Sequence, residues 1–90
     1  MALFLSLHQA PGLSPEEIAG YGPDVARGVY ATFRQLYVNT DTGFIVSVYE
    51  ADSAAAVEQE FERVGFPFDS ITEIDFTLSA AELTEMLARG

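Results

Sequence analysis

Residues 43–74 read GFIVSVYEADSAAAVEQEFERVGFPFDSITEI, and this stretch decides the fold. It begins with a run of β-branched and aromatic residues, 44–49, which is typical of a buried strand. Asp52 or Ser53 can then cap a helix whose apolar residues share one face before a glycine ends it. A second strand is predicted around residues 71–77. Strand, helix and strand, with one apolar helix face, make half of a ferredoxin-like domain.

The flanking segments supply the other half of such a domain. In order, the predicted elements are a strand at 2–8, a broken helix at 15–27, strands at 31–39 and 44–50, a helix at 53–64, a strand at 71–77, and a terminal helix after the capping box at 79–82. The order βαββαβ plus a terminal helix predicts an α+β fold. We therefore expect a ferredoxin-like two-layer sandwich with a four-stranded antiparallel sheet, formed by residues 1–90 as a single domain.

The composition narrows the class of protein. The 90 residues are 49% hydrophobic, which argues against disorder despite a formal net charge of −10. The only basic residues are four arginines, so neither nucleic acid nor an anionic membrane surface is a predicted partner. The absence of cysteine excludes disulfides, thiolate catalysis and cysteine-based metal sites. No segment has the features of a signal peptide or of a membrane span, so a soluble cytoplasmic protein is expected.

The two faces of the predicted sheet differ in their side chains. If the aliphatic residues of the strands, among them the leucines of residues 2–8, lie under the helices, an aromatic face stays open. Such a patch favours a homodimer of the dimeric α/β-barrel type, whose inner space often holds a ligand. The residues predicted near the centre of this interface are Phe4, Phe33, Tyr37 and Ile45. The alternative is that these side chains are scattered singly and need no partner.

One polar constellation is the candidate ligand site. His8 ends the first strand, which we expect between the third strand, parallel to it, and the fourth, antiparallel to it. This order predicts that His8 lies near Tyr49 and Glu73. The three side chains would anchor a small polar ligand, or do acid–base chemistry, and Glu73 would raise the pKa of His8. The alternative is a strand-end histidine that is hydrogen-bonded to a neighbour.

Several short motifs resemble those of one family. They are Tyr49-Glu50-Ala51, Ala54, Ala56 and Val57, Glu62-Arg63, Gly65, Pro67, Asp69, Ile71 and Ile74, with His8, Pro11-Gly12-Leu13 and Glu16-Glu17 near the N-terminus. The chain thereby resembles small ferredoxin-like proteins of unknown function that include an actinobacterial nickel-binding protein. The resemblance implies nickel binding, but relatives often carry a cysteine where this chain has Val46-Ser47-Val48 and a histidine at Phe61. With His8 as the sole imidazole, no tight nickel site is predicted.

The acidic residues are not expected to form a site. Glu50, Asp52 and Asp69 lack the spacing of a metal loop, so no metal and no cofactor are predicted. The glutamates of the second helix, Glu58, Glu60 and Glu62, are interpreted as a solvated face.

Three functional classes remain open. The first is a small-ligand-binding or non-catalytic homodimer that resembles the nickel-binding proteins. The second is a cofactor-independent dimeric-barrel enzyme, monooxygenase- or isomerase-like, that uses His8 and Glu73. The third is a protein-interaction module. Fold alone does not choose between them.

Overall fold

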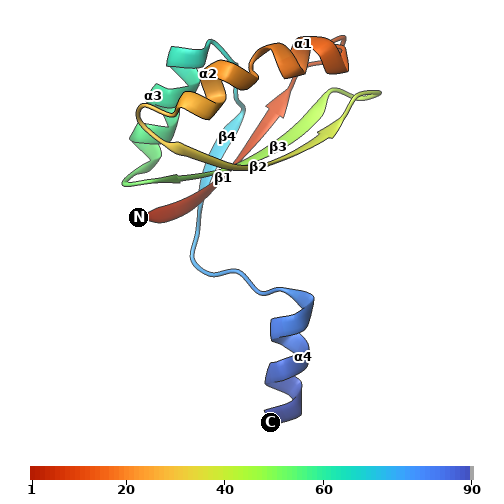
Figure 1. Cartoon of the computed structure of the whole chain (residues 1–90), viewed down its shortest axis with the longest axis vertical. Coiled ribbons are helices and arrows are strands. Elements are labelled where there is room, and N and C mark those ends of the chain that lie inside the picture. Colours follow the sequence, from red (N-terminus) through yellow and green to blue (C-terminus); the bar gives the residue numbers. More distant parts are fainter. Residues whose placement is uncertain (90) are drawn as a thin grey trace.

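The computed structural model describes residues 1–89, in which one sheet is covered on one face by helices and a last helix stands apart (Figure 1). The elements in order are β1 (Ala2–Gln9), α1 (Pro15–Gly20), α2 (Gly22–Arg27), β2 (Thr32–Asn39), β3 (Phe44–Ala51), α3 (Ala54–Val64), β4 (Ser70–Ile74) and α4 (Ala80–Arg89). The four strands lie in the order β2-β3-β1-β4, and every neighbouring pair is antiparallel. This arrangement confirms the predicted ferredoxin-like α+β fold.

The direction of β1 relative to β3 differs from the expectation. We expected the two strands to be parallel, but they are antiparallel, with His8 opposite Ile45 and Phe4 opposite Tyr49. The reason is the path of the chain. The helices α1 and α2 cross over the sheet and bring β2 back in the direction of β1, and the hairpin then reverses β3.

The helices cover the face opposite to the one predicted. Phe4, Ile45 and Tyr49 are buried beneath them, with Val57 and Phe61 of α3 packed in the same layer. The leucines of β1 alternate with these residues and point to the open face, where they are only half-buried. The aliphatic side of the sheet is therefore the exposed one.

This reversal corrects the predicted dimer interface. Phe4 and Ile45 are core residues, and Phe33 packs its ring against Tyr49 with centroids 5.6 Å apart. Of the four proposed interface residues, Tyr37 alone lies on the open face, where it pairs with Val46. The prediction failed because Ser6 and His8 share the inner face, and these polar residues were expected to point outward.

A β-bulge between Phe33 and Gln35 also affects the faces. Before the bulge Phe33 faces the helices, and after it Leu36, opposite Ser47, faces them as well. Strict alternation along a strand would place residues 33 and 36 on opposite faces. Because of the extra residue, both Phe33 and Leu36 of β2 face the helical layer.

Local sequence signals position the helices as predicted. The helical segment 15–27 is broken into α1 and α2, with a capping box between Ser14 and Glu17 at its start. The Ser53 hydroxyl caps α3 by accepting a hydrogen bond from the amide of Ala56. Gly65 ends α3 in the left-handed conformation, at φ 82°.

The helix α4 stands apart from the rest of the structure. The chain leaves β4 at Ile74 and continues as an extended segment, 75–79, before α4 begins (Figure 1). The radius of gyration is 14.9 Å, whereas a compact domain of this length has about 12 Å. We call residues 75–89 the C-terminal arm.

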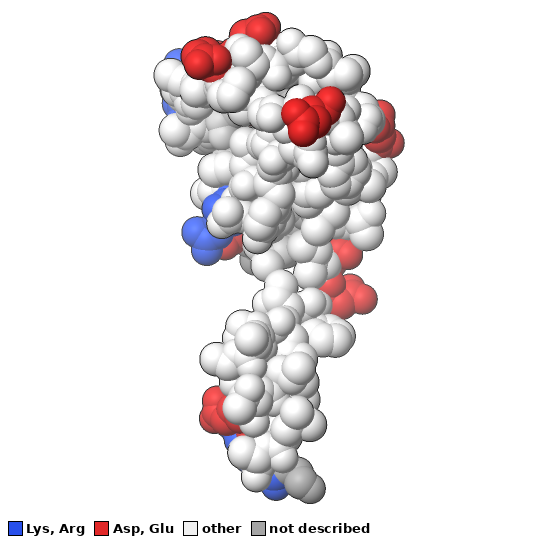
Figure 2. Space-filling view, turned by 90° about the vertical axis from the view of Figure 1, so that its right-hand side faces the viewer, with Lys and Arg blue, Asp and Glu red and all other residues white. Residues whose placement is uncertain are grey.

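The face of the molecule in Figure 2 carries acidic side chains without one dominant cluster. Figure 2 shows Asp and Glu spread over the body and the arm on the face in view. Among residues 1–89, no helix is long and apolar enough to span a membrane.

Candidate functional site

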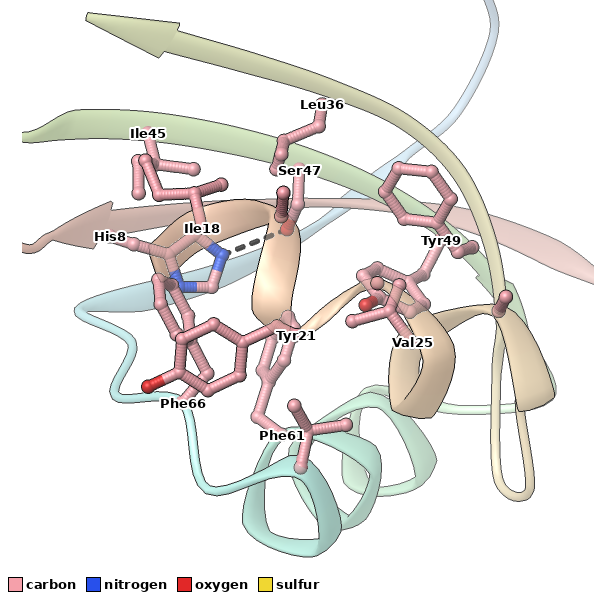
Figure 3. A pocket seen from close by; sticks show the side chains of 15 residues that line it. His8, Ile18, Tyr21, Val25, Leu36, Ile45, Ser47, Tyr49, Phe61 and Phe66 are labelled. Carbon is pink, nitrogen blue, oxygen red and sulfur yellow. Dashed lines mark hydrogen bonds between the residues drawn. The ribbon is translucent and has the colours of Figure 1, made fainter. Parts of the chain in front are cut away.

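A cavity lies between α1, α2, α3 and the inner face of the sheet (Figure 3). Its volume is about 280 Å³, close to the lower end of the range for small-molecule sites. Most of its lining is aliphatic or aromatic, and the polar side chains among the lining residues are His8, Tyr21, Ser47 and Tyr49. The cavity therefore combines an apolar wall with a few hydrogen-bonding groups.

His8 is held on both sides of its ring. Its Nδ1 lies 2.8 Å from the carbonyl oxygen of Pro67, and its Nε2 lies 2.8 Å from Oγ of Ser47. A carbonyl can only accept, so Nδ1 carries the proton, and in the neutral ring Nε2 accepts the hydrogen bond that the Ser47 hydroxyl donates. The rings of Phe61 and Phe66 pack against it, with centroids 4.8 and 5.1 Å away.

Burial sets the protonation state of this histidine. Its side chain is 1% exposed. Burial lowers the pKa of His8, and this effect outweighs the Pro67 carbonyl and the charge of Asp69, which both raise it. The expected rise through Glu73 is therefore wrong.

We predict that less than half of the folded protein carries a protonated His8 at pH 6.5, the ordinary pKa of histidine. Below that pH the unfolded chain binds a proton at His8 that the folded chain excludes, so the free energy of unfolding falls as the pH drops. Proton NMR of the imidazole and denaturant unfolding between pH 7.5 and 5.5 measure both effects. His8→Asn should lose this part of the pH dependence, and a folded-state pKa above 6.5 would contradict the argument.

The structure separates Glu73 from His8. Both Tyr49 and Glu73 lie opposite Phe4, which is four residues, or about 13 Å, along β1 from His8. Glu73 is exposed, whereas Tyr49 is buried and lines the cavity together with His8. Burial, followed by the charge of Glu60, raises the pKa of Tyr49 to about 12. The predicted three-residue site is thus reduced to His8 and Tyr49, which both pack against the ring of Phe61.

Glu60 is a buried charge that the sequence interpretation missed. It is not on a solvated face, because its side chain is fully buried. Oε1 accepts hydrogen bonds from the amides of Val29 and Tyr30, at 3.1 and 2.9 Å, and Oε2 lies 2.5 Å from the Arg63 guanidinium. Its position beside Val57 and Phe61, on the apolar face of α3, was the available signal.

These partners keep Glu60 ionised. Burial by itself raises the pKa of the carboxyl, but the hydrogen bonds from Arg63, Tyr30 and Val29 outweigh burial and lower the pKa. The same arginine donates to the carbonyl of Asp24 at 2.5 Å. This ion pair therefore joins α3 to α2 and to the segment that precedes β2.

The site offers poor ligands for a metal ion. Within residues 1–89, no group of three or more His, Asp or Glu side chains is arranged to hold a metal. The side chains that contact the His8 ring include those of Ser47 and Phe61. A hydroxyl and a phenyl ring thus occupy the places beside the imidazole.

Comparisons with known proteins agree with this architecture. The family model described as nickel responsive protein SCO4226-like matches residues 4–74. The crystal structure of SCO4226 from Streptomyces coelicolor A3(2) is similar with a TM-score of 0.74 and 25% sequence identity, covering 84% of this chain and 99% of that chain. No curated protein matches the chain. The matched residues end at Ile74, so the C-terminal arm lies beyond them.

Proposed function

The chain belongs to the nickel responsive SCO4226-like family, and we propose that it is a non-catalytic protein that binds a small, mostly apolar molecule. The observation that supports the proposal is the cavity beneath α1 and α2, whose polar side chains are few. Apolar walls with a small number of placed polar groups are typical of small-molecule sites.

The hydrogen bonds at His8 define the chemistry of the proposed ligand. The Ser47 hydroxyl donates its proton to Nε2 of His8, so its oxygen keeps lone pairs that accept from a ligand. The volume of about 280 Å³ suits a molecule of the size of a substituted aromatic ring. We therefore infer an aromatic or aliphatic body with one hydrogen-bond donor, such as a hydroxyl group.

Phenol and toluene form a matched pair of probes for this site. We predict that phenol binds more tightly than toluene, by about 2- to 12-fold, because one hydrogen bond contributes about 0.5–1.5 kcal/mol. Ligand-observed NMR with the full-length protein measures both affinities. Ser47→Ala should remove the preference for phenol, and Val25→Trp should weaken both ligands by filling the cavity. Equal affinities for the two probes, or an unchanged preference in Ser47→Ala, would contradict the proposed ligand class.

We also predict that the protein forms no tight complex with nickel. Both nitrogens of His8 already have hydrogen-bond partners, and the chain contains no cysteine. Calorimetric titration should give the same weak isotherm for the natural chain and for His8→Asn. The double variant S47C/F61H, which places a thiol and an imidazole beside His8, should bind nickel more tightly. A stoichiometric complex of the natural chain, abolished by His8→Asn, would overturn the prediction.

A catalytic role for His8 with Glu73 is not proposed, because Glu73 of β4 pairs with Phe4, which is four residues along β1 from His8.

A specific observation supports a second role, self-association. The open face of the sheet carries a continuous aliphatic surface, made by Leu3, Leu5, Leu7, Val46 and Val48. Tyr37, 60% exposed, and Phe44, 43% exposed, extend this surface.

We propose that the protein is a homodimer that buries this open face. A contiguous apolar surface of this kind is uncommon on a monomer. Light scattering of the full chain should therefore give about twice the protomer mass of 9.8 kDa. A monomer at high micromolar concentration would contradict the homodimer.

A further inference from the structure

The C-terminal arm carries an apolar stripe that is not buried against any other part of residues 1–89. Leu83, Met86 and Leu87 follow helical spacing, so they lie along one side of α4. No residue of α4 is buried, and Leu87 is 73% exposed. Phe76, in the preceding extended segment, is 80% exposed.

The hydrogen bonds of the arm are local. The Ser79 hydroxyl and the Glu82 carboxylate form a capping box, Thr84 donates to the carbonyl of Ala80, and Arg89 pairs with Glu85. A helix of 10 residues is shorter than the roughly 12–15 residues at which isolated helices become even marginally stable. The capping box fixes where α4 begins, but its stability requires an apolar surface to pack against.

We propose that α4 of each molecule docks on the open sheet face of a second copy of this chain, across a two-fold axis. The inference rests on the proposed homodimer and names the segment that covers the open face. The dimensions match, because a helix of 10 residues is about 15 Å long, and four strands span about 14 Å from edge to edge. The exchange gives both unpartnered surfaces of each chain a partner at the same time.

The connection between β4 and α4 favours a second molecule over the chain's own sheet. Residues 75–79 read DFTLS, without glycine or proline, and the central Phe-Thr-Leu favours extended backbone. The segment leads away from the sheet, in the direction in which β4 ends (Figure 1). Docking on the chain's own open face would require a reversal within these five residues.

The charges on the arm argue against a membrane as its partner. Residues 80–89 contain Glu82 and Glu85 and a single arginine, Arg89, which pairs with Glu85. Helices that bind anionic membrane surfaces carry a basic polar face. A second copy of the chain offers instead the aliphatic surface around Leu5 and Val48, at the centre of the open face.

Disulfide trapping tests the docking directly, because the chain contains no cysteine. Val48→Cys places one thiol at the centre of the open face, and Met86→Cys places another on the apolar side of α4. The two full-length single variants are mixed and oxidised mildly, and the products are separated without reducing agent. Asp41→Cys, in the exposed hairpin, replaces each partner in turn as the control.

The expected product is a disulfide between Val48→Cys of one molecule and Met86→Cys of another, identified by peptide mass, with the control forming little of it. A product that joins only two copies of Val48→Cys would show face-to-face sheets, which keeps the homodimer and overturns the inference. In the double variant, a disulfide confined to one molecule would show docking in its own chain and also overturn it. A monomeric mass without any cross-link would overturn the inference and the homodimer together.

A variant without cysteine gives an independent measurement. Leu83→Glu should raise the dimer dissociation constant by about 10²- to 10⁴-fold, because the two-fold exchange buries one Leu83 from each chain and the variant loses both. Ala81→Glu, on the opposite side of α4, should leave it unchanged. Equal dissociation constants for these two variants would overturn the proposed docking. Helix α4 adds no residue to the core, so Leu83→Glu should leave the fold intact.

Discussion

Replacing Glu60 with alanine is expected to lower the free energy of unfolding by about 3–5 kcal/mol, the usual cost of breaking a buried ion pair. The change leaves the amides of Val29 and Tyr30 without their acceptor and leaves the Arg63 guanidinium without its carboxylate. Urea denaturation at a fixed protein concentration measures the difference. Because small domains have only about 5–15 kcal/mol of stability, this single change should remove a large share of it.

The exposed glutamate Glu58, on the same helix, supplies the control. Glu58→Ala should change the free energy of unfolding by no more than about 0.5 kcal/mol, and a similar cost for both variants would contradict the role assigned to Glu60. The difference should also depend on pH. The partners of Glu60 lower its pKa, so the stabilisation is complete above its ordinary value of 4.5 and is lost as the pH falls through the lowered pKa.

Replacing Phe61 with alanine should cost a similar amount, about 3–5 kcal/mol, as is usual for a buried aromatic ring. Phe61 is 3% exposed and lies at the centre of the aromatic layer. Its ring packs edge-on against His8 and Tyr49, with centroids at 4.8 and 5.3 Å, and tilted against Phe68 at 5.4 Å. Removing it enlarges the existing cavity and takes away contacts from all three neighbours.

Phe61→Leu is the matched control, because it keeps an apolar side chain of intermediate size. It should cost clearly less than Phe61→Ala in the same urea denaturation experiment. If Phe61→Ala lost less than about 1 kcal/mol, the aromatic layer would not be the main core of the domain.

The sequence predicted the elements because their signals are local. The capping box at Ser14, the hydroxyl cap of Ser53 and the glycine at the end of α3 each act within a few residues, and the structure has all three. The break near Gly20 and Pro23 was likewise predictable, because proline and glycine limit a helix whatever the rest of the fold does.

The orientation of the sheet was not predictable in the same way. One set of alternating residues in β1 consists of three leucines, whereas the other set includes the polar residues Ser6 and His8, so the leucines were expected to face the helices. What allows His8 to be buried is its pair of hydrogen bonds to Pro67 and Ser47, which are distant in the sequence. The bulge in β2 adds one residue to the strand, so a strictly alternating sequence pattern assigns the residues on one side of it to the wrong face.

The prediction of the candidate site was likewise limited by contacts between residues that are distant in the sequence. His8 and Tyr49 were identified, and both line the cavity. Glu73 was included because the antiparallel pair of β1 and β4 was expected to bring it near the end of β1, but the register places Ser70 opposite Leu7 and Glu73 opposite Phe4. Tyr49 was expected there because β1 and β3 were expected to be parallel, and their antiparallel pairing places it opposite Phe4 as well. Glu60 was overlooked because its partners at Val29 and Tyr30 lie about 30 residues away, where helical spacing carries no information.

The strand order has a consequence for synthesis on the ribosome. Although β1 precedes the other strands in the chain, it lies inside the sheet, between β3 and β4. The growing chain can close β1 against β3 only after residue 51 has emerged, and the other edge of β1 stays open until residues 70–74 follow. At about 5–20 residues per second this interval lasts roughly 1–5 s. During it the nascent sheet presents an unpaired β1 edge, which can pair with a strand of another chain.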